Sequence, residues 1–208
     1  MNEPLSNMLI GIPESVANLQ LPDPTLRDLY RDEEDRVYWL DSLIDDTALD
    51  LVKMIMRCNK EDKGVPVDER KPIKVFVDSP GGDVLTTWTI INAMKMSKTK
   101  VITINYCTAY SASCLILAAG HKRYALPGTS AMIHDGSCSY SGESKQVDST
   151  KKFFDKLDKK LNEDFFANTK IDKKIYKRKA ATDWFLTEDE MVEYGIVDAV
   201  VTDFDELF

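Results

Sequence analysis

The chain of 208 residues fits one domain comfortably and two only with difficulty. Its hydrophobic residues make up 43% of the sequence, which allows a sizeable core and excludes both a disordered chain and a small disulfide-dependent scaffold. The formal net charge of −8 argues against a nucleic-acid partner, because phosphate binding needs clustered lysine and arginine side chains.

The first part of the chain is expected to contain an irregular arm, a strand and a helix. Residues 1–29 carry four prolines and little periodicity, which predicts an arm ahead of a single domain formed by residues 30–208. Residues 36–40 are typical of a strand, and apolar side chains at helical spacing predict a helix over 47–59. The charged stretch 60–71 is expected to be a surface loop.

The middle of the chain has the most regular pattern. The predicted elements are, in order, a strand (73–77), a tight turn (79–82), a helix capped by Asp83 that reaches about residue 97, a strand (101–106), a short helix (113–119) and two short strands (123–126 and 131–134). The first strand–helix–strand unit should be parallel with a right-handed crossover. This pattern indicates the α/β class.

The last part of the chain is expected to begin with a long helix over residues 144–168. Apolar side chains recur there at intervals of three and four residues, at Val147, Phe154, Leu157, Leu161 and Phe165. A helix this far from the βαβ unit is expected to bury that stripe against another subunit. Thr187 and Glu190 form the pattern of a capping box, Gly195 ends the short helix that follows, and residues 196–201 predict a last strand.

The cysteines and the N-terminus indicate a cytoplasmic protein. None of the four cysteines stands in a CxxC pair or at metal-ligand spacing, and we interpret Cys58 and Cys107 as small core residues of a reducing compartment. The N-terminus lacks the basic and apolar regions of an export signal, and no apolar run approaches the ~18 residues of a membrane span. No membrane association is expected.

Two serines and one histidine are candidates for acyl transfer. Such chemistry needs a hydroxyl, a base within reach, a group that orients the base and two donors for the oxyanion. His134 ends an apolar strand and is well placed as a base. Ser113 is preferred over Ser111 as the nucleophile, because the N–H of Cys114 can serve as an oxyanion donor and Ser111 can simply cap the helix. The turn that contains Gly81 and Gly82 can supply the second donor.

Five motifs in register then resemble the ClpP family, the proteolytic subunit of the Clp ATP-dependent proteases. The similarity covers roughly residues 30–202. The motifs are SPGG (79–82), AS (112–113) opening a helix, LP (126–127), MIH (132–134) and the pair DWFLT (183–187) with EYGIVD (193–198).

The resemblance implies a crotonase-like α/β fold and a role for each matching residue. Ser113 matches the nucleophile, His134 the base and Asp183 the orienting carboxylate, while Gly82 and Cys114 match the backbone oxyanion donors. Residues 144–168 match a protruding handle helix. The positions that match the substrate groove are Gly81, Tyr140 and Gly142.

The resemblance also implies the partners. It predicts an endopeptidase without metal or organic cofactor that acts on unfolded polypeptides inside a homo-oligomeric, heptameric ring fed by a Clp-type ATPase. Ala181 and Thr182 stand where the family usually has charged residues that help the contact between rings, so one ring or two stacked rings are both open. Three alternatives remain: an inactive ring scaffold, a crotonase-type acyl-CoA enzyme, and a phage-type head-maturation protease with the same chemistry.

Overall fold

The computed structural model describes residues 26–136 and 140–208. Its helices are α2 (Arg27–Asp35), α3 (Leu49–Glu61), α4 (Val84–Met96), α5 (Ala112–Ala118), α6 (Ser144–Asn168), α7 (Lys173–Lys179) and α8 (Glu188–Glu193). Its strands are β1 (Val37–Leu40), β2 (Ile73–Ser79), β3 (Val101–Tyr110), β4 (Lys122–Ala125), β5 (Ser130–Ile133), β6 (Trp184–Thr187) and β7 (Ala199–Val200).

The strands form one sheet that is parallel except at β6. Its order is β1-β2-β3-β4-β7, and β5 branches off to pair with β3 and β6. The long β3 pairs with β4 through its first half and with β5 through its last three residues, both in parallel. β6 is antiparallel to β5. The pairing of β2 with β3 across α4 is parallel, so the predicted α/β class is confirmed.

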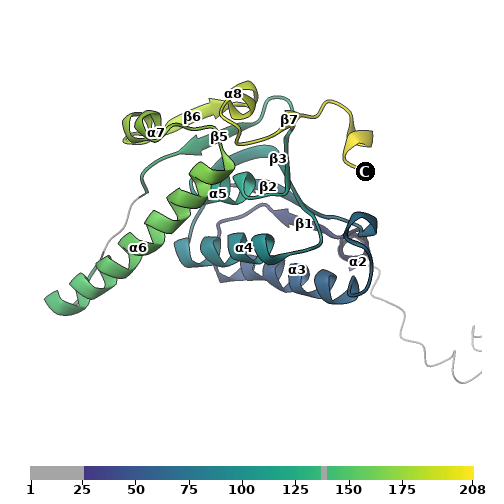
Figure 1. Cartoon of the computed structure of the whole chain (residues 1–208), viewed down its shortest axis with the longest axis horizontal. Coiled ribbons are helices and arrows are strands. Elements are labelled where there is room, and N and C mark those ends of the chain that lie inside the picture. The colour runs from purple at the N-terminus through teal and green to yellow at the C-terminus, as the bar shows by residue number, and fades with distance from the viewer. Residues whose placement is uncertain (1–25, 137–139) are drawn as a thin grey trace, which may run out of the picture.

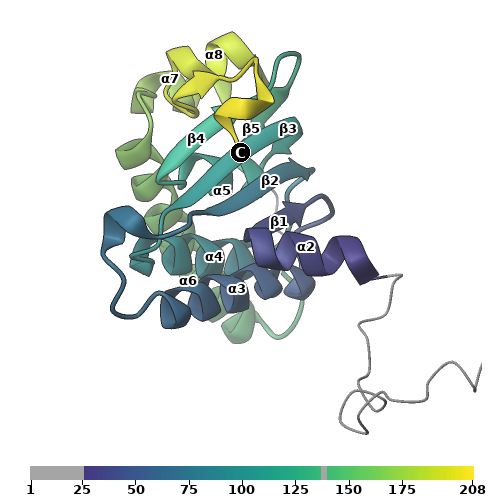
Figure 2. The same ribbon diagram turned by 90° about the vertical axis from the view of Figure 1, so that its right-hand side faces the viewer.

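Helices cover the sheet and build the main core. α3 and α4 pack against each other below the sheet, and α5 lies between the sheet and α6 (Figure 1). Figure 2 shows α2 beside β1 at one edge and α7 and α8 at the other end of the molecule. The side chains of α3, α4, α5 and the strands form one buried apolar cluster. A smaller cluster on the opposite face of the sheet contains Val37, Phe76, Ile104, Val201 and Leu207.

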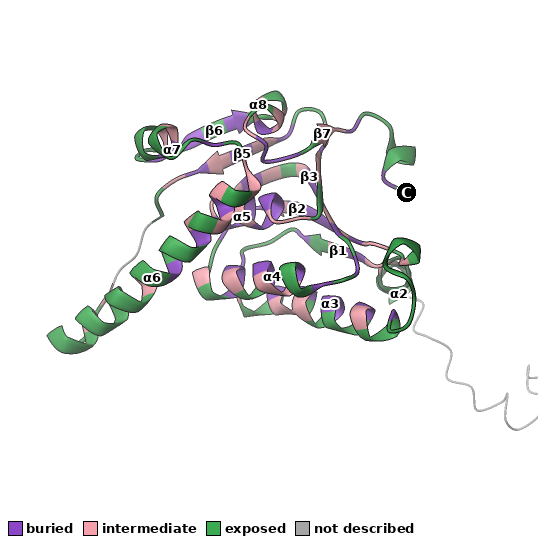
Figure 3. Cartoon of the chain, viewed as in Figure 1, coloured by how far each residue is buried: buried purple, intermediate pink, exposed green. Residues whose placement is uncertain are grey.

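α6 has the predicted bounds and runs away from the globular part of the chain (Figure 1). The apolar stripe of its second half, Leu157, Leu161 and Phe165, is buried against the chain's own core. Its first half is largely exposed (Figure 3), and Phe153 is 54% exposed. Of the five stripe residues expected to pack on another subunit, the chain itself therefore buries three and leaves Val147 and Phe154 partly exposed.

Several boundaries differ from the predictions. Residues 1–25 of the expected arm lie outside the described residues, and residues 27–29 belong to α2. β3 continues to Tyr110 instead of ending at 106, α7 was not predicted, and β7 is only two residues long. Cys107 is exposed and not part of the core, because it lies in a bulge of β3. Val77 of β2 pairs with Asn105 and Ser79 pairs with Ala109, so one residue of β2 stands opposite residues 106–108 of β3.

Two features are absent from the described residues. None of their helices is long and apolar enough to cross a membrane. They also contain no cluster of three or more histidine, cysteine, aspartate or glutamate side chains that could hold a metal ion.

Candidate active site

A one-residue turn joins the end of β3 to the start of α5. Ser111 is the single residue between them, and its backbone has φ 55° and ψ −121°. L-residues other than glycine rarely adopt such a conformation, which costs about 1–3 kcal/mol and persists only where the surroundings impose it. Here the Ser111 N–H donates a 2.8 Å hydrogen bond to the carbonyl oxygen of Met132, which ties the turn to β5. A strained strand-to-helix turn of this kind presents the nucleophile in α/β-hydrolases.

The Ser111 hydroxyl faces a histidine. His134 follows β5 directly, and β5 lies beside the last residues of β3. Its Nε2 atom is 2.7 Å from Ser111 Oγ. Ser111 occupies the N-cap position of α5, yet its side chain makes no capping hydrogen bond. The expectation that Ser111 serves only as a helix cap is therefore wrong.

Asp183 lies on the other side of the imidazole ring. The antiparallel pairing of β5 with β6 sets Ile133 opposite Trp184, so the residues just beyond this pair, His134 and Asp183, are brought together. Asp183 Oδ1 is 3.8 Å from His134 Nδ1, and the side chains of Asp183 and His134 are 59% and 27% exposed. This distance is longer than a hydrogen bond. The strand pairing thus places the carboxylate beside Nδ1, the ring nitrogen that does not face Ser111, but beyond hydrogen-bonding distance.

Ser113 is not within reach of His134. Its side chain is fully buried, and its hydroxyl lies 2.7 Å from the carbonyl oxygen of Ser79 and 2.8 Å from that of Tyr110. The prediction that Ser113 pairs with the base is therefore wrong. The physical reason is that α5 begins at Ala112, so the Ser113 side chain turns back to the carbonyl three residues earlier, as serine hydroxyls in helices often do.

Of the two expected oxyanion donors, the N–H of Cys114 is already hydrogen-bonded and the N–H of Gly82 is not, within the described part of the chain. The N–H of Cys114 donates to the carbonyl oxygen of Ser111 at 3.0 Å, so the prediction that it is a free donor is wrong. The N–H groups of Gly82 and Ala112 donate no hydrogen bond to any described residue. Gly81 packs directly on the turn, since a Cβ atom there would lie 2.7 Å from the Tyr110 carbonyl oxygen. The glycine turn and the Ser111 turn are therefore in contact.

A cavity of about 90 Å³ opens beside the Ser111–His134 pair. Its walls come from Gly82, from the starts of α4 and α5, from Asp135 and Gly136, and from α6 and α7. Tyr140 and Gly142, which were expected to line the substrate groove, do not border this cavity, and the ring of Tyr140 lies 6.0 Å from that of Phe154. Residues 137–139 of the expected groove strand lie outside the described residues.

The chain also matches a known protein family. A family model described as Clp protease matches residues 32–204. The match spans the sheet, the Ser111 turn, His134, Asp183 and the whole of α6. Because it covers far more than half of the chain, the protein belongs to the Clp protease family.

Proposed function

We propose that the protein hydrolyses peptide bonds by acyl transfer to Ser111, with His134 as the general base and Asp183 as the orienting carboxylate. One observation carries this proposal: the 2.7 Å contact between Ser111 Oγ and His134 Nε2, on a turn that holds Ser111 in a strained conformation. Strain of this kind gathers at functional sites. Ser111 takes the nucleophilic role that the sequence assigned to Ser113.

The reaction follows from the positions of these groups. His134 Nε2 accepts the proton of the Ser111 hydroxyl while Oγ attacks the scissile carbonyl carbon. The resulting imidazolium gives that proton to the leaving amine, and the acyl group stays on Ser111. A water molecule, deprotonated by His134, then releases the acid and restores the hydroxyl.

The N–H groups of Gly82 and Ala112 are the proposed oxyanion donors. Both belong to the two turns that meet beside Ser111, and neither donates a hydrogen bond to a described residue. Ala112 is the first residue of α5, so its N–H also lies at the positive end of the helix. Ala112 replaces Cys114, whose N–H is already used.

Asp183 is proposed to fix the imidazole tautomer with the proton on Nδ1. Its carboxylate lies on that side of the ring at 3.8 Å. In free enzymes such contacts are often long and tighten when the substrate binds. Asp135, the nearer carboxylate in the sequence, has its N–H bound to the carbonyl oxygen of Ala180 and forms no ion pair with His134 in the described structure.

We further propose that the protein works as a ring around a closed chamber. Clp proteases in general form rings and work with ATPase partners. The exposed first half of α6, with Phe153 at the surface, is a natural contact for another subunit. A heptameric ring would admit only extended chains, so folded substrates would need an ATPase that unfolds them.

The pairing of serine and histidine supports hydrolysis over two of the alternatives. A crotonase-type acyl-CoA enzyme uses two backbone donors but needs no Ser–His pair, so the 2.7 Å contact favours hydrolysis. An inactive scaffold would have no reason to keep a strained serine against a base.

The test is labelling with a fluorophosphonate, followed by intact mass and peptide mapping, alongside hydrolysis of short fluorogenic peptides. We expect one label per chain, on Ser111, and no label or hydrolysis in Ser111→Ala. Ser113→Ala is the matched control and should still be labelled. Asp183→Asn should stay folded but lose turnover by up to about 10⁴-fold, because the amide favours the wrong tautomer.

Two results would overturn this proposal. A label that maps to Ser113 would return the nucleophile to that residue. A wild-type protein that takes no label and cleaves no peptide, while native mass spectrometry shows an intact ring, would make it a scaffold.

A further inference from the structure

The cavity beside Ser111 has apolar walls near the nucleophile. Val84 of α4, Leu115 of α5 and Leu161 of α6 border it together with Ser111 and His134. The side chain that enters such a cavity belongs to the residue on the acyl side of the scissile bond, P1, because it is attached one bond from the attacked carbonyl. The methylene groups of a long side chain can pack on these walls.

The far side of the same cavity is acidic. Asp135 and Asp158 both border it, and neither forms an ion pair with a described residue. No lysine or arginine is among the described residues that line it. The pKa of Tyr176, another lining residue, is raised to about 12, mainly by burial and next by the negative charge of Asp135. The cavity therefore carries negative charge with no cation to balance it.

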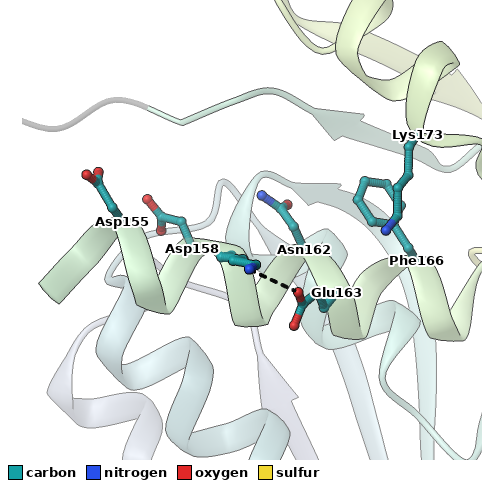
Figure 4. A pocket seen from close by; sticks show the side chains of 7 residues that line it. Asp155, Asp158, Asn162, Glu163, Phe166 and Lys173 are labelled. Atoms are coloured by element: carbon teal, nitrogen blue, oxygen red, sulfur yellow. Dashed lines mark ion pairs between the residues drawn. The ribbon is translucent and has the colours of Figure 1, made fainter. Parts of the chain in front are cut away.

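Asp158 is turned toward this cavity by its place on α6. Figure 4 shows the neighbouring pocket of about 440 Å³, which shares Asp158 and Asn162 with the cavity beside Ser111. Asp158 and Asn162 project there from the side of α6 that faces the segment after β5. Neither described lysine of the neighbouring pocket pairs with Asp158: Lys159 pairs with Glu163 at 3.9 Å, and Lys173 Nζ lies 5.4 Å from the centroid of the Phe166 ring. Asp158 is exposed, and partial desolvation and next the charge of Asp155 raise its pKa, as expected for a carboxylate without a cation.

We propose that this cavity selects a lysine or arginine side chain at P1, with its stem on Val84, Leu115 and Leu161 and its charge at Asp158. This inference rests on the proposed function and adds its substrate class. A leucine or methionine at P1 would bury apolar surface equally well but would leave both exposed carboxylates without a partner. A basic side chain supplies that partner.

The experiment compares fluorogenic peptides that differ only at P1, with lysine, leucine or glutamate. The wild-type protein should cleave the lysine peptide with the highest kcat/KM. Asp158→Asn should lower the ratio of kcat/KM for lysine over leucine by about five- to tenfold, the effect of one partly exposed charge contact. Asp148→Asn is the control, since it removes the same charge from the first half of α6 and does not border the cavity, and it should change the ratio by about twofold or less. Asp158→Lys should shift the preference toward glutamate.

A second measurement does not depend on turnover. Peptidyl phosphonates with lysine or leucine at P1 react once with an active serine, so the rate of mass gain at Ser111 reports the same preference. Faster or equal labelling by the leucine reagent, or an identical ratio in Asp158→Asn and Asp148→Asn, would overturn this inference and leave the peptidase intact. Failure of both reagents to label Ser111 would overturn the proposed function as well.

Discussion

Two serines, two positions apart in the sequence, should respond to substitution in opposite ways. Ser111 is strained and faces the base, whereas Ser113 is helical and fully buried, and its hydroxyl lies between two carbonyl oxygens. Ser113→Ala should therefore cost stability and spare the chemistry. Ser111→Gly should abolish the chemistry and raise stability.

The cost of Ser113→Ala follows from its hydrogen bonds. The hydroxyl has one proton and lies between the carbonyl oxygens of Ser79 and Tyr110, so its removal takes away one hydrogen bond in a buried place. Leaving a buried acceptor without its partner costs about 1–3 kcal/mol. Because the substitution removes a single oxygen atom, little cavity is added. For a chain of this length, a loss of about 2 kcal/mol lowers the Tm by roughly 4–8 °C.

The gain from Ser111→Gly follows from the backbone. A residue with φ 55° and ψ −121° stores about 1–3 kcal/mol of strain when it carries a side chain, and glycine adopts this conformation freely. The greater conformational freedom of glycine in the unfolded chain reduces that gain by about 0.5–1 kcal/mol. The net stabilisation is about 1 kcal/mol, or roughly 2–4 °C in Tm.

Thermal unfolding and fluorophosphonate labelling of the same preparations measure both effects. The reasoning predicts a lower Tm with retained label for Ser113→Ala, and a higher Tm without label for Ser111→Gly. The opposite pairing, with an unchanged Tm and no label in Ser113→Ala, would refute the assignment of the two serines. A fall in Tm for Ser111→Gly would show that the turn at Ser111 is not under strain.

Local sequence signals predicted most of the fold. The bounds of α6, the capping of α4 by Asp83 and the capping box of Thr187 and Glu190 agree with the structure. Each of these depends on residues within one or two helical turns of each other, so a single stretch of sequence holds all the information. The parallel β2–α4–β3 unit followed from the alternation of such stretches.

The end of β3 could not be predicted in this way, and the error shifted the predicted nucleophile by two residues, from Ser111 to Ser113. Residues 106–108 form the bulged part of β3, with Thr108 held by the carboxylate of Asp78 in the neighbouring strand. A bulge interrupts the two-residue alternation by which a strand is recognised. The sequence therefore predicted a helix that starts at Ser113, whereas the helix starts at Ala112 and leaves Ser111 in the turn.

The position of Asp183 beside His134 depends on the pairing of two strands that are distant in the sequence. Trp184 faces Ile133 only because β6 runs antiparallel to β5, and nothing near either residue in the sequence encodes that partner. The resemblance to a family pointed to Asp183, and the strand register supplies the physical reason for its place beside His134. The acidic wall of the cavity was missed for the same reason, since Asp135 and Asp158 are far apart in the sequence and border one cavity only in the folded chain.

Substitutions at Gly82 and Asp62, with Gly128→Ala as a control, test the glycine turn of the site and a buried ion pair of the fold. Gly82→Ala should abolish peptide hydrolysis and lower the Tm, because its Cβ would overlap the carbonyl oxygen of Ile44, whereas Gly128→Ala, with open space around it, should lower the Tm only slightly and keep activity. Asp62 is buried and bound to the guanidinium of Arg36 at 2.8 Å, which lowers the pKa of the carboxyl group. A lowered pKa in the folded state contributes stability above the unfolded value of about 3.9, and that contribution is lost as the pH falls through the folded value. Because Arg36 keeps the Lys71 carbonyl and Glu61 as partners, Asp62→Asn should reduce the free energy of unfolding in urea by about 1.5–3 kcal/mol at pH 7, the value of a hydrogen bond between charged groups, and the deficit should shrink below about pH 4. An equal deficit at pH 7 and pH 3 would mean that the charge of Asp62 does not contribute and that only its shape and hydrogen bonds matter.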